Sequence, residues 1–297
     1  MQSVGGGPPA EEQQVPTCTR HPDRETYISC QRCGRPICPE CMNQAAVGFQ
    51  CPDCVAEGRR GQPKVRTAYG GGIHARDTVV TISLIATNIA VFVAILATGG
   101  SASALGEALS MVSGEVRLFG LPPDAGVVHG EYWRILTSAF VHIETYHLLF
   151  NMVAIGFIGS VLERLLGRWR YLALYFVSCL VAGVTVYWLS PPDAMTYGAS
   201  GGVFGLLAAA LVIFRKQGYD TQWLLLLLGF NLVLTFTRGS ISWQGHIGGL
   251  VGGLAVAAAL AYAPRERRRV VHTGAIVGIT VVSLALIAVR TLVLDVP

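Results

Sequence analysis

The stretch QGHIGGLVGGLAVAAALAYA, residues 244–263, contains no charged side chain in twenty residues. About twenty mostly apolar residues are what an α-helix needs to cross the hydrocarbon core of a bilayer. Three of its glycines, Gly245, Gly249 and Gly253, recur every four residues and therefore share one helix face. A face of small residues lets another helix backbone approach closely. The stretch predicts a membrane-spanning helix that packs tightly against a neighbour.

Six further apolar runs predict an all-α polytopic membrane protein with seven spans in total. The runs are about 78–98, 147–165, 171–190, 199–214, 222–237 and 270–293. Only 13% of the residues are charged, against roughly 25% in soluble domains, so an ordinary soluble enzyme is disfavoured. The net charge of +4 is small for a nucleic-acid binder, so we expect the lipid bilayer and not nucleic acid as a partner.

Basic residues in the loops between these runs predict the orientation in the membrane. With the N-terminus in the cytoplasm, the inner loops hold nine basic residues: Arg164, Arg168, Arg170, Arg215, Lys216, Arg265, Arg267, Arg268 and Arg269. The outer loops hold three, which are Arg117, Arg134 and Arg238. We therefore expect a cytoplasmic N-terminus and an external C-terminus, although a re-entrant or surface helix is the alternative for 270–293. The large excess of arginine over lysine favours a bacterial cell membrane.

The region before the first run has a different composition, with seven of the eight cysteines. It has neither the basic nor the apolar segment of a secretory signal peptide. We expect a disordered tail at 1–17, a zinc-binding domain at 18–57 and a basic, glycine-rich linker at 58–77. A membrane core of six helices follows at 78–263, and 264–297 holds the seventh helix.

The cysteines of this region form four pairs with two residues between the members of each pair. The pairs are Cys18 with His21, Cys30 with Cys33, Cys38 with Cys41, and Cys51 with Cys54. Two pairs complete a tetrahedral Zn²⁺ shell, so eight ligands predict two closed, structural zinc sites without a position for a catalytic water. A segment of about 40 residues cannot build a sufficient apolar core, so metal binding must supply much of its folding free energy. A disulfide framework, the alternative, would need an oxidising compartment and normally an even number of cysteines.

The spacing of the four pairs resembles a B-box-like zinc finger. This resemblance implies that the first and third pairs share one ion, and the second and fourth pairs the other. Such modules bind proteins or only stabilise themselves. A cytoplasmic protein partner is therefore one expectation for this domain, and self-stabilisation is the other.

A serine and a histidine in two of the apolar runs could form a hydrolytic pair. Ser200 lies in Gly198-Ala199-Ser200-Gly201 at the start of a run, where free backbone N–H groups could form an oxyanion hole. His246 lies on the glycine-rich run quoted above, and could act as general base toward Ser200 if the two helices approach closely. The alternatives are a serine that serves close packing alone and a histidine bonded to a carbonyl.

Another polar group precedes and opens the second run. His147 and Asn151 are four residues apart, so they project from one helix face, and both can donate hydrogen bonds to an oxyanion. His142 lies five residues before His147, in the loop or first turn. A zinc site of the H-E-x-x-H type is excluded because the residue four after His147 is Asn151 and not a second histidine.

Together these residues resemble the rhomboid intramembrane serine proteases, over about 78–263. The matching features, in chain order, are Trp133-Arg134, His142, His147-x3-Asn151, Glu163, Gly198-Ala199-Ser200-Gly201, and His246-x2-Gly249-x3-Gly253. A seventh helix also occurs in part of that family.

The resemblance implies a role for each matching residue. Ser200 is expected to be the nucleophile and His246 its base, in a dyad without an acid. The Ser200 N–H and the side chains of His147 and Asn151 are expected to form the oxyanion hole. Phe204 is expected to stack on the catalytic histidine.

Other parts of the chain acquire expectations from the same resemblance. Trp133, Arg134 and Glu163 are expected to be architectural, with Glu163 linking helices through hydrogen bonds. The span 222–237 is expected to be a lateral gate. The substrates would be transmembrane segments of single-pass proteins, and no cofactor is needed for this chemistry. Rhomboid-like proteins that only bind and route membrane clients are the alternative, but they lack the serine or the histidine. A transporter is disfavoured because charged residues at mid-membrane and repeated halves are not evident.

Overall fold

The computed structural model describes residues 15–60, 66–72, 78–114 and 125–294. The chain divides into two compact units, Met1–Lys64 and Val65–Pro297. Most of the expected N-terminal tail and parts of the expected linker lie outside the described residues. Thr17, which we placed in the tail, instead belongs to the first strand of unit one.

The first unit is small and has little regular structure. Strand β1 (Thr17–Cys18) pairs antiparallel with β2 (His21–Glu25), and β3 (Asn43–Gln44) pairs with β4 (Phe49–Gln50). A 3-10 turn, Pro39–Cys41, and helix α1, Pro52–Arg60, complete it. Its buried apolar cluster consists of six cysteines and Ile37. A core with one fully buried aliphatic side chain buries little apolar surface for a fold of this size.

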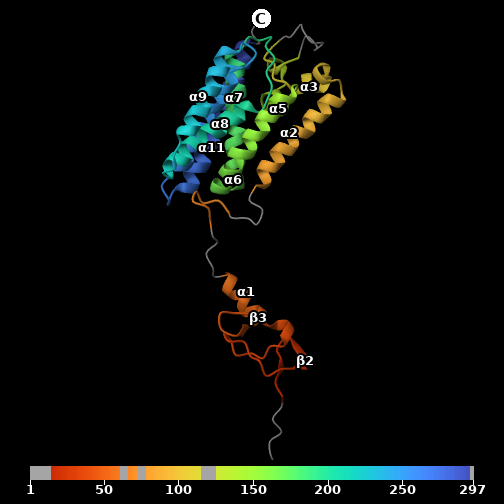
Figure 1. The fold of residues 1–297 in the computed structure, drawn as a ribbon, viewed down its shortest axis with the longest axis vertical. Helices are drawn as coiled ribbons and strands as arrows, with labels where there is room; N and C mark the ends of the chain where they lie inside the picture. Colours follow the sequence, from red (N-terminus) through yellow and green to blue (C-terminus); the bar gives the residue numbers. More distant parts are fainter. Residues whose placement is uncertain (1–14, 61–65, 73–77, 115–124, 295–297) are drawn as a thin grey trace, which may run out of the picture. The chain divides into compact units, whose positions relative to one another are not determined.

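The second unit is a bundle of membrane-length helices (Figure 1). Six of the seven expected spans are single helices: α2 (Val79–Ala97), α7 (Arg168–Leu189), α8 (Ser200–Lys216), α9 (Gln222–Thr237), α10 (Trp243–Tyr262) and α11 (Arg268–Leu294). The second span is a continuous run of α5 (Thr145–Ala154), a π-helical segment (Ile155–Gly159) and α6 (Ser160–Leu166). Five of these are long and apolar enough to span a membrane, while α8 and α9 are shorter. The protein is therefore an integral, multi-span membrane protein with a small cysteine-rich unit at its N-terminus.

A long connection with its own short helices joins α2 to α5. It contains a 3-10 turn at Gly100–Ala102, α3 (Ala104–Leu109), a second 3-10 turn at Val127–His129, α4 (Arg134–Thr137) and a third 3-10 turn at Ser138–Phe140. Arg134 is buried and organises this segment. Its guanidinium donates to the Glu131 carboxylate at 2.6 Å and to the carbonyls of Glu107 and Ser110 at 2.6 and 2.9 Å. The Trp133 indole donates to the Ala108 carbonyl at 3.2 Å.

Glu163 joins two helices that are far apart in the sequence. Its buried carboxylate accepts hydrogen bonds from the backbone N–H groups of Val80 and Thr81, at 2.9 and 2.8 Å, and from the Thr81 hydroxyl at 2.8 Å. The first N–H groups of a helix have no partner within the helix, and a negative charge there is favourable. Glu163 on α6 therefore caps the start of α2 and fixes the two helices against each other.

Part of the expected linker packs against the membrane unit. Tyr69 is buried in its main apolar cluster, and its hydroxyl accepts a hydrogen bond from Gln217 at 3.4 Å. Gly71 lies so close to the turn between α6 and α7 that a Cβ there would be 2.8 Å from the Gly167 Cα. One aromatic side chain and one close glycine contact therefore anchor this part of the predicted basic, glycine-rich linker to the membrane unit.

Candidate active site and metal centres

Ser200 and His246 come together across two helices. Ser200 is the first residue of α8, and His246 lies in the first turn of α10. The Ser200 Oγ lies 2.8 Å from the His246 Nε2, which is hydrogen-bond distance. Because Ser200 starts its helix, its N–H is among the four that have no acceptor within the helix. This arrangement offers a nucleophile, a base and a backbone donor in one place.

Glycines make this distance between the two helices attainable. A Cβ at Gly249 would lie 2.9 Å from the Cα of Gly201 and closer still to its carbonyl oxygen. A Cβ at Gly253 would overlap the backbone of Gly205 in the same way. The helices α8 and α10 thus touch backbone to backbone at two successive turns. Larger side chains here would separate the helices and with them the Ser200–His246 pair.

The His246 ring is held from two further sides. The Phe204 ring, one turn after Ser200, stacks on it with centroids 4.2 Å apart and an interplanar angle of 21°. The Nδ1 of His246 lies 2.7 Å from the Thr235 hydroxyl, which comes from α9. The Phe204 stack is as the rhomboid resemblance implies, whereas the contact with Thr235 was not expected. No sequence signal distinguishes this threonine from the others on α9.

The His147 ring contacts Gly198, which lies two residues before Ser200. A Cβ at Gly198 would lie 2.8 Å from the His147 Nε2, and Gly198 has φ +120°, a backbone conformation that other residues rarely adopt. Two independent reasons therefore require glycine two residues before Ser200. This glycine lets the His147 imidazole contact the chain segment that leads into Ser200.

Asn151 and His142 form a buried polar pair next to His147. The Asn151 amide Nδ2 donates to the His147 carbonyl at 3.0 Å and lies 3.3 Å from the His142 Nε2. The Ala199 N–H also donates to the His142 Nε2, at 3.4 Å. Burial, and then the neighbouring His147, lower the pKa of His142 to about 4, so its ring is neutral at physiological pH. The expected oxyanion donor Asn151 thus has its amide N–H groups engaged within the protein, and one would have to turn toward a substrate.

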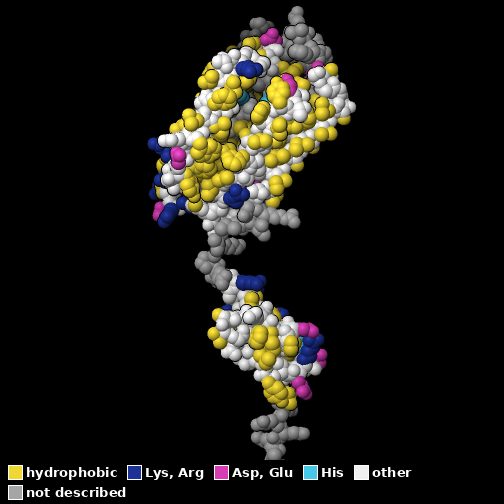
Figure 2. Space-filling view, in the orientation of Figure 1, with side chains coloured by type: hydrophobic (Ala, Val, Ile, Leu, Met, Phe, Trp, Pro, Cys, Tyr) yellow, Lys and Arg dark blue, Asp and Glu magenta, His cyan; other side chains and the backbone are white. Residues whose placement is uncertain are grey.

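An acidic residue and a tyrosine, both overlooked in the sequence, adjoin His147. The Glu144 carboxylate lies 3.7 Å from the His147 Nδ1, and the Tyr197 hydroxyl donates to it at 3.2 Å. Burial and the Glu144 charge raise the pKa of Tyr197 to about 12, so the phenol stays protonated and remains a donor. The Nδ1 of His147 is on the side of Glu144, and the Cε1–Nε2 edge of the ring lies nearest to Gly198. In the space-filling view the membrane unit is hollowed on this face, and histidine side chains are visible inside the hollow (Figure 2).

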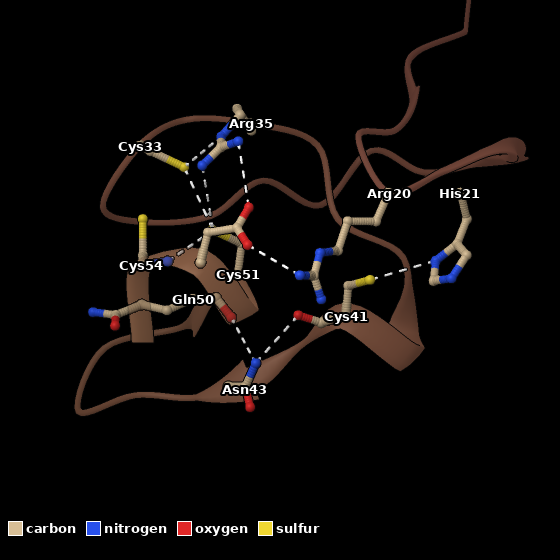
Figure 3. Close-up of polar contacts among 10 residues, drawn as sticks. Arg20, His21, Cys33, Arg35, Cys41, Asn43, Gln50, Cys51 and Cys54 are labelled. Atoms are coloured by element: carbon tan, nitrogen blue, oxygen red, sulfur yellow. Dashed lines mark hydrogen bonds and ion pairs between the residues drawn. The ribbon is translucent and has the colours of Figure 1, made fainter. Parts of the chain in front are cut away.

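The paired ligands of the first unit gather into two tetrads. One consists of Cys18, His21, Cys38 and Cys41, and the other of Cys30, Cys33, Cys51 and Cys54. Within each tetrad the ligand atoms lie within 4.8 Å of one another. The first and third pairs thus share one site, and the second and fourth the other, as the B-box resemblance implies. Figure 3 shows Cys41 beside His21, and Cys33 beside Cys51 and Cys54.

The distances within the tetrads fit zinc. A tetrahedron with Zn–S bonds of about 2.3 Å has ligand-to-ligand edges of about 3.8 Å. The Sγ atoms of Cys33 and Cys51 are 3.8 Å apart, and the His21 Nδ1 lies 3.3 to 3.9 Å from the three thiol sulfurs of its tetrad. A disulfide would require about 2.05 Å between sulfurs, and all eight cysteines are free. Two Cys/His tetrads that could bind metal are therefore present.

The pKa values of the thiols differ widely within each tetrad. Burial acts to raise the pKa of Cys18 and of Cys30, but nearby backbone N–H donors outweigh it and lower both values to about 6. Burial raises the pKa of Cys41 to about 11 and that of Cys54 to about 12. Each tetrad thus contains a ready thiolate and a thiol that must lose its proton to the solvent when a metal binds.

Comparison with known proteins matches the same part of the chain. The profile of the "Rhomboid domain" family matches residues 129–263, which include Ser200 and His246. The "Putative rhomboid protease YdcA" of Bacillus subtilis (strain 168) is 35% identical over 148 residues, or 48% of this chain and 74% of that protein. The "Rhomboid protease GluP" of the same organism is 36% identical over 148 residues, which is 48% of this chain but only 29% of GluP. The "Rhomboid protease AarA" of Providencia stuartii is 29% identical over 168 residues, or 47% of this chain and 59% of AarA.

Proposed function

Because this chain belongs to the rhomboid family, we propose that it is an active serine endopeptidase that cleaves transmembrane segments of single-pass membrane proteins. The observation that carries this proposal is the 2.8 Å contact between the Ser200 Oγ and the His246 Nε2. A nucleophile within hydrogen-bond reach of a base is the signature of covalent catalysis by serine. Proteins named as rhomboid proteases among the relatives support the same reaction class.

The proposed reaction has two steps. The Ser200 Oγ attacks the carbonyl carbon of the scissile peptide bond while the His246 Nε2 takes the hydroxyl proton. The C–N bond then breaks, and His246 returns the proton to the leaving amine, so that an acyl-enzyme ester on Ser200 remains. Water then attacks the ester carbonyl while the His246 Nε2 takes its proton; the ester C–O bond breaks, His246 returns the proton to the Ser200 Oγ, and the acid product leaves. The Phe204 ring packs against the imidazole throughout and restricts its rotation.

The negative oxygen formed in each step needs hydrogen-bond donors. We assign this role to the Ser200 N–H at the start of α8, the His147 Nε2 and the Asn151 Nδ2. The Glu144 carboxylate at the His147 Nδ1 favours the tautomer or ionised form that carries a proton on Nδ1. Donation by the His147 Nε2 requires a proton on that nitrogen, which the imidazole gains by a change of tautomer or by protonation when a substrate binds.

We expect Asn151→Ala to reduce kcat by about 10²–10³-fold, the usual cost of removing one oxyanion donor. Asn151→Asp keeps the shape of the side chain but removes both N–H donors, so its loss should be of similar size. Cleavage of a fluorescent transmembrane reporter in detergent measures both. Wild-type kcat in both variants would contradict the assignment of Asn151 to the oxyanion hole.

The reaction is proposed to occur toward the outer side of a bacterial cell membrane. The basic residues at the inner loops support a cytoplasmic N-terminal unit and an outward-facing start of α8 and α10. Helix α9 and the loop Arg238–Trp243 are proposed as the gate and cap through which a substrate helix enters from lipid. Only Leu224 and Thr235 of its sixteen residues are buried, which supports a loosely packed helix.

The rival function is that of a client-binding protein without catalysis. The presence of both Ser200 and His246 at bonding distance favours the protease. Two measurements decide between the functions: reporter cleavage by wild type against Ser200→Ala, and labelling of wild type by a fluorophosphonate probe. A folded protein that neither cleaves nor labels would support client binding.

For the first unit we propose two structural Zn²⁺ ions, one in each tetrad. With four protein ligands each, the sites would leave no open position for chemistry. No residue of this unit belongs to the proposed catalytic site. Its further role would be recruitment of a cytoplasmic protein partner or stabilisation of itself.

Removal of the metal should unfold the first unit and spare the second. We expect two zinc ions per chain by elemental mass spectrometry, and about one after Cys30→Ser, with Cys179→Ala, which alters the cysteine outside the tetrads, as the control. A strong chelator should make residues 15–60 sensitive to trypsin while reporter cleavage persists, as it should after deletion of residues 1–57. Protease resistance that is indifferent to chelation would contradict the structural role of zinc.

A further inference from the structure

Thr235 joins the helix α9 to the proposed catalytic base. Its side chain is 2% exposed, and with Leu224 it is one of only two buried residues on that helix. The Thr235 Oγ1 lies 2.7 Å from the His246 Nδ1 and 2.7 Å from the Asn231 carbonyl oxygen. Apart from Leu224, the other residues of α9 are at least partly exposed, so this hydroxyl is a specific polar link in a loosely packed interface.

The two hydrogen bonds of Thr235 have defined directions. The Asn231 carbonyl can only accept, so the single hydroxyl hydrogen of Thr235 is donated to it. The hydroxyl oxygen then has only its lone pairs left for His246, and must accept the Nδ1–H. A neutral imidazole that carries its proton on Nδ1 has its free lone pair on Nε2. That is the atom 2.8 Å from the Ser200 Oγ.

We propose that Thr235 is a positioning residue for the proposed catalytic base: it selects the tautomer of His246 that can deprotonate Ser200. In Ser-His-Asp triads a buried carboxylate performs this selection. Here a neutral hydroxyl performs it, and its own orientation is set by a backbone carbonyl one turn earlier on α9. The inference rests on the proposed function, because it concerns the base of that reaction.

The location of Thr235 also couples the base to α9. The residue that orients His246 belongs to the helix proposed as the gate and not to α8 or α10. Any displacement of α9 that separates the Thr235 Oγ1 from the His246 Nδ1 breaks this hydrogen bond. The His246 ring is then no longer restricted to the tautomer with its proton on Nδ1. The base is therefore fully oriented only when α9 is in the position seen in this structure, and an open gate would leave the dyad less reactive.

Three variants on α9 test this proposal. Thr235→Val keeps the shape of the side chain but removes the hydroxyl, and Thr235→Ser keeps the hydroxyl but removes the methyl group. Thr237→Val is the matched control, because the Thr237 Oγ1 is exposed and bonds only to the carbonyls of Val233 and Leu234 on its own helix. Reporter cleavage gives kcat and KM separately, and a small fluorophosphonate probe reports the reactivity of Ser200 without a helical substrate.

We expect Thr235→Val to lower kcat and the probe-labelling rate about ten- to a hundredfold, as for the loss of a buried hydrogen bond that leaves its partner unpaired. KM should change less than about twofold, and Thr235→Ser and Thr237→Val should both stay within about threefold of wild type. Equal rates for Thr235→Val and Thr237→Val would overturn the proposal. So would a loss in Thr235→Ser as large as in Thr235→Val, or an effect confined to KM.

The outcome is separable from that of the proposed function. Cleavage that survives Ser200→Ala rejects the dyad itself. An inactive Ser200→Ala together with a fully active Thr235→Val rejects only the positioning role of Thr235.

Discussion

Ser200→Ala is expected to reduce cleavage of a transmembrane reporter to the uncatalysed background. The hydroxyl of Ser200 is the only side-chain oxygen within hydrogen-bond distance of the His246 Nε2 among the described residues. Its removal leaves no nucleophile to form the acyl-enzyme, and the oxyanion donors alone have no attacking group to assist. Rate losses of about 10⁴-fold or more are usual when a nucleophile–base unit is broken.

Ser200 and His246 act together in one chemical step, and this predicts how their single and double variants compare. His246→Ala should lose nearly as much activity as Ser200→Ala, and the double variant should lose no more than either, because both residues act in the same step. Fluorophosphonate labelling should vanish in Ser200→Ala and be strongly reduced in His246→Ala. The control is Ser160→Ala, which removes a hydroxyl bonded only to the Phe157 carbonyl on its own helix. Undiminished cleavage by Ser200→Ala would reject the dyad.

Gly249→Val is expected to reduce kcat by about 10²-fold or more without touching a reacting atom. A side chain at position 249 would overlap the carbonyl group of Gly201, which is backbone and cannot turn aside. The helices α8 and α10 would have to separate, and the 2.8 Å contact between the Ser200 Oγ and the His246 Nε2 would open with them. Overpacking a close interface costs about 1–3 kcal/mol of stability, and a misplacement of about 1 Å can cost 10²-fold in rate.

A matched glycine variant makes this result interpretable. Gly274 lies within α11, and no atom outside its own helix lies within 4 Å of the position that a Cβ would take. Gly274→Val should therefore leave kcat and the midpoint of thermal unfolding close to those of wild type. Gly249→Ala should lie between Gly249→Val and wild type in both measurements. Equal behaviour of the Gly249→Val and Gly274→Val proteins would show that the α8–α10 contact is not what holds the dyad together.

Much of the architecture could be predicted from local patterns. Apolar runs located the seven long helices of the described part of the membrane unit, five of them long enough to span a bilayer, because an uncharged stretch of that length has few stable alternatives to a helix in lipid. The predicted start of the last run, at residue 270, and the observed start of α11 at Arg268 differ by two residues. Tyr69 and Gly71, which lie in the predicted basic, glycine-rich linker, contact the membrane unit. Such contacts depend on which distant surface a single side chain meets, and no periodicity encodes that.

The site residues likewise divide into those that the sequence indicates and those that only the fold reveals. Ser200, His246, His147 and Asn151 stood out because polar side chains are rare and costly within apolar runs. Thr235 did not, because a threonine near a helix end usually bonds its own backbone, as Thr237 does. Glu144 and Tyr197 lie in different segments, and only the fold shows that they meet beside His147.

The sequence by itself determined which atoms are available for chemistry: the paired thiols of the first unit, and the few polar groups within the apolar runs. Residue type and short-range spacing suffice for this, because two residues between ligands, or three between glycines, place groups on one turn or one helix face. Only the tertiary structure decided which of these groups meet. Backbone contact between α8 and α10 brings Ser200 to the His246 Nε2, and the packing of α9 brings Thr235 to its Nδ1. Hydrogen bonds act over about 3 Å, so tautomer and reactivity depend on helix positions that no local pattern specifies.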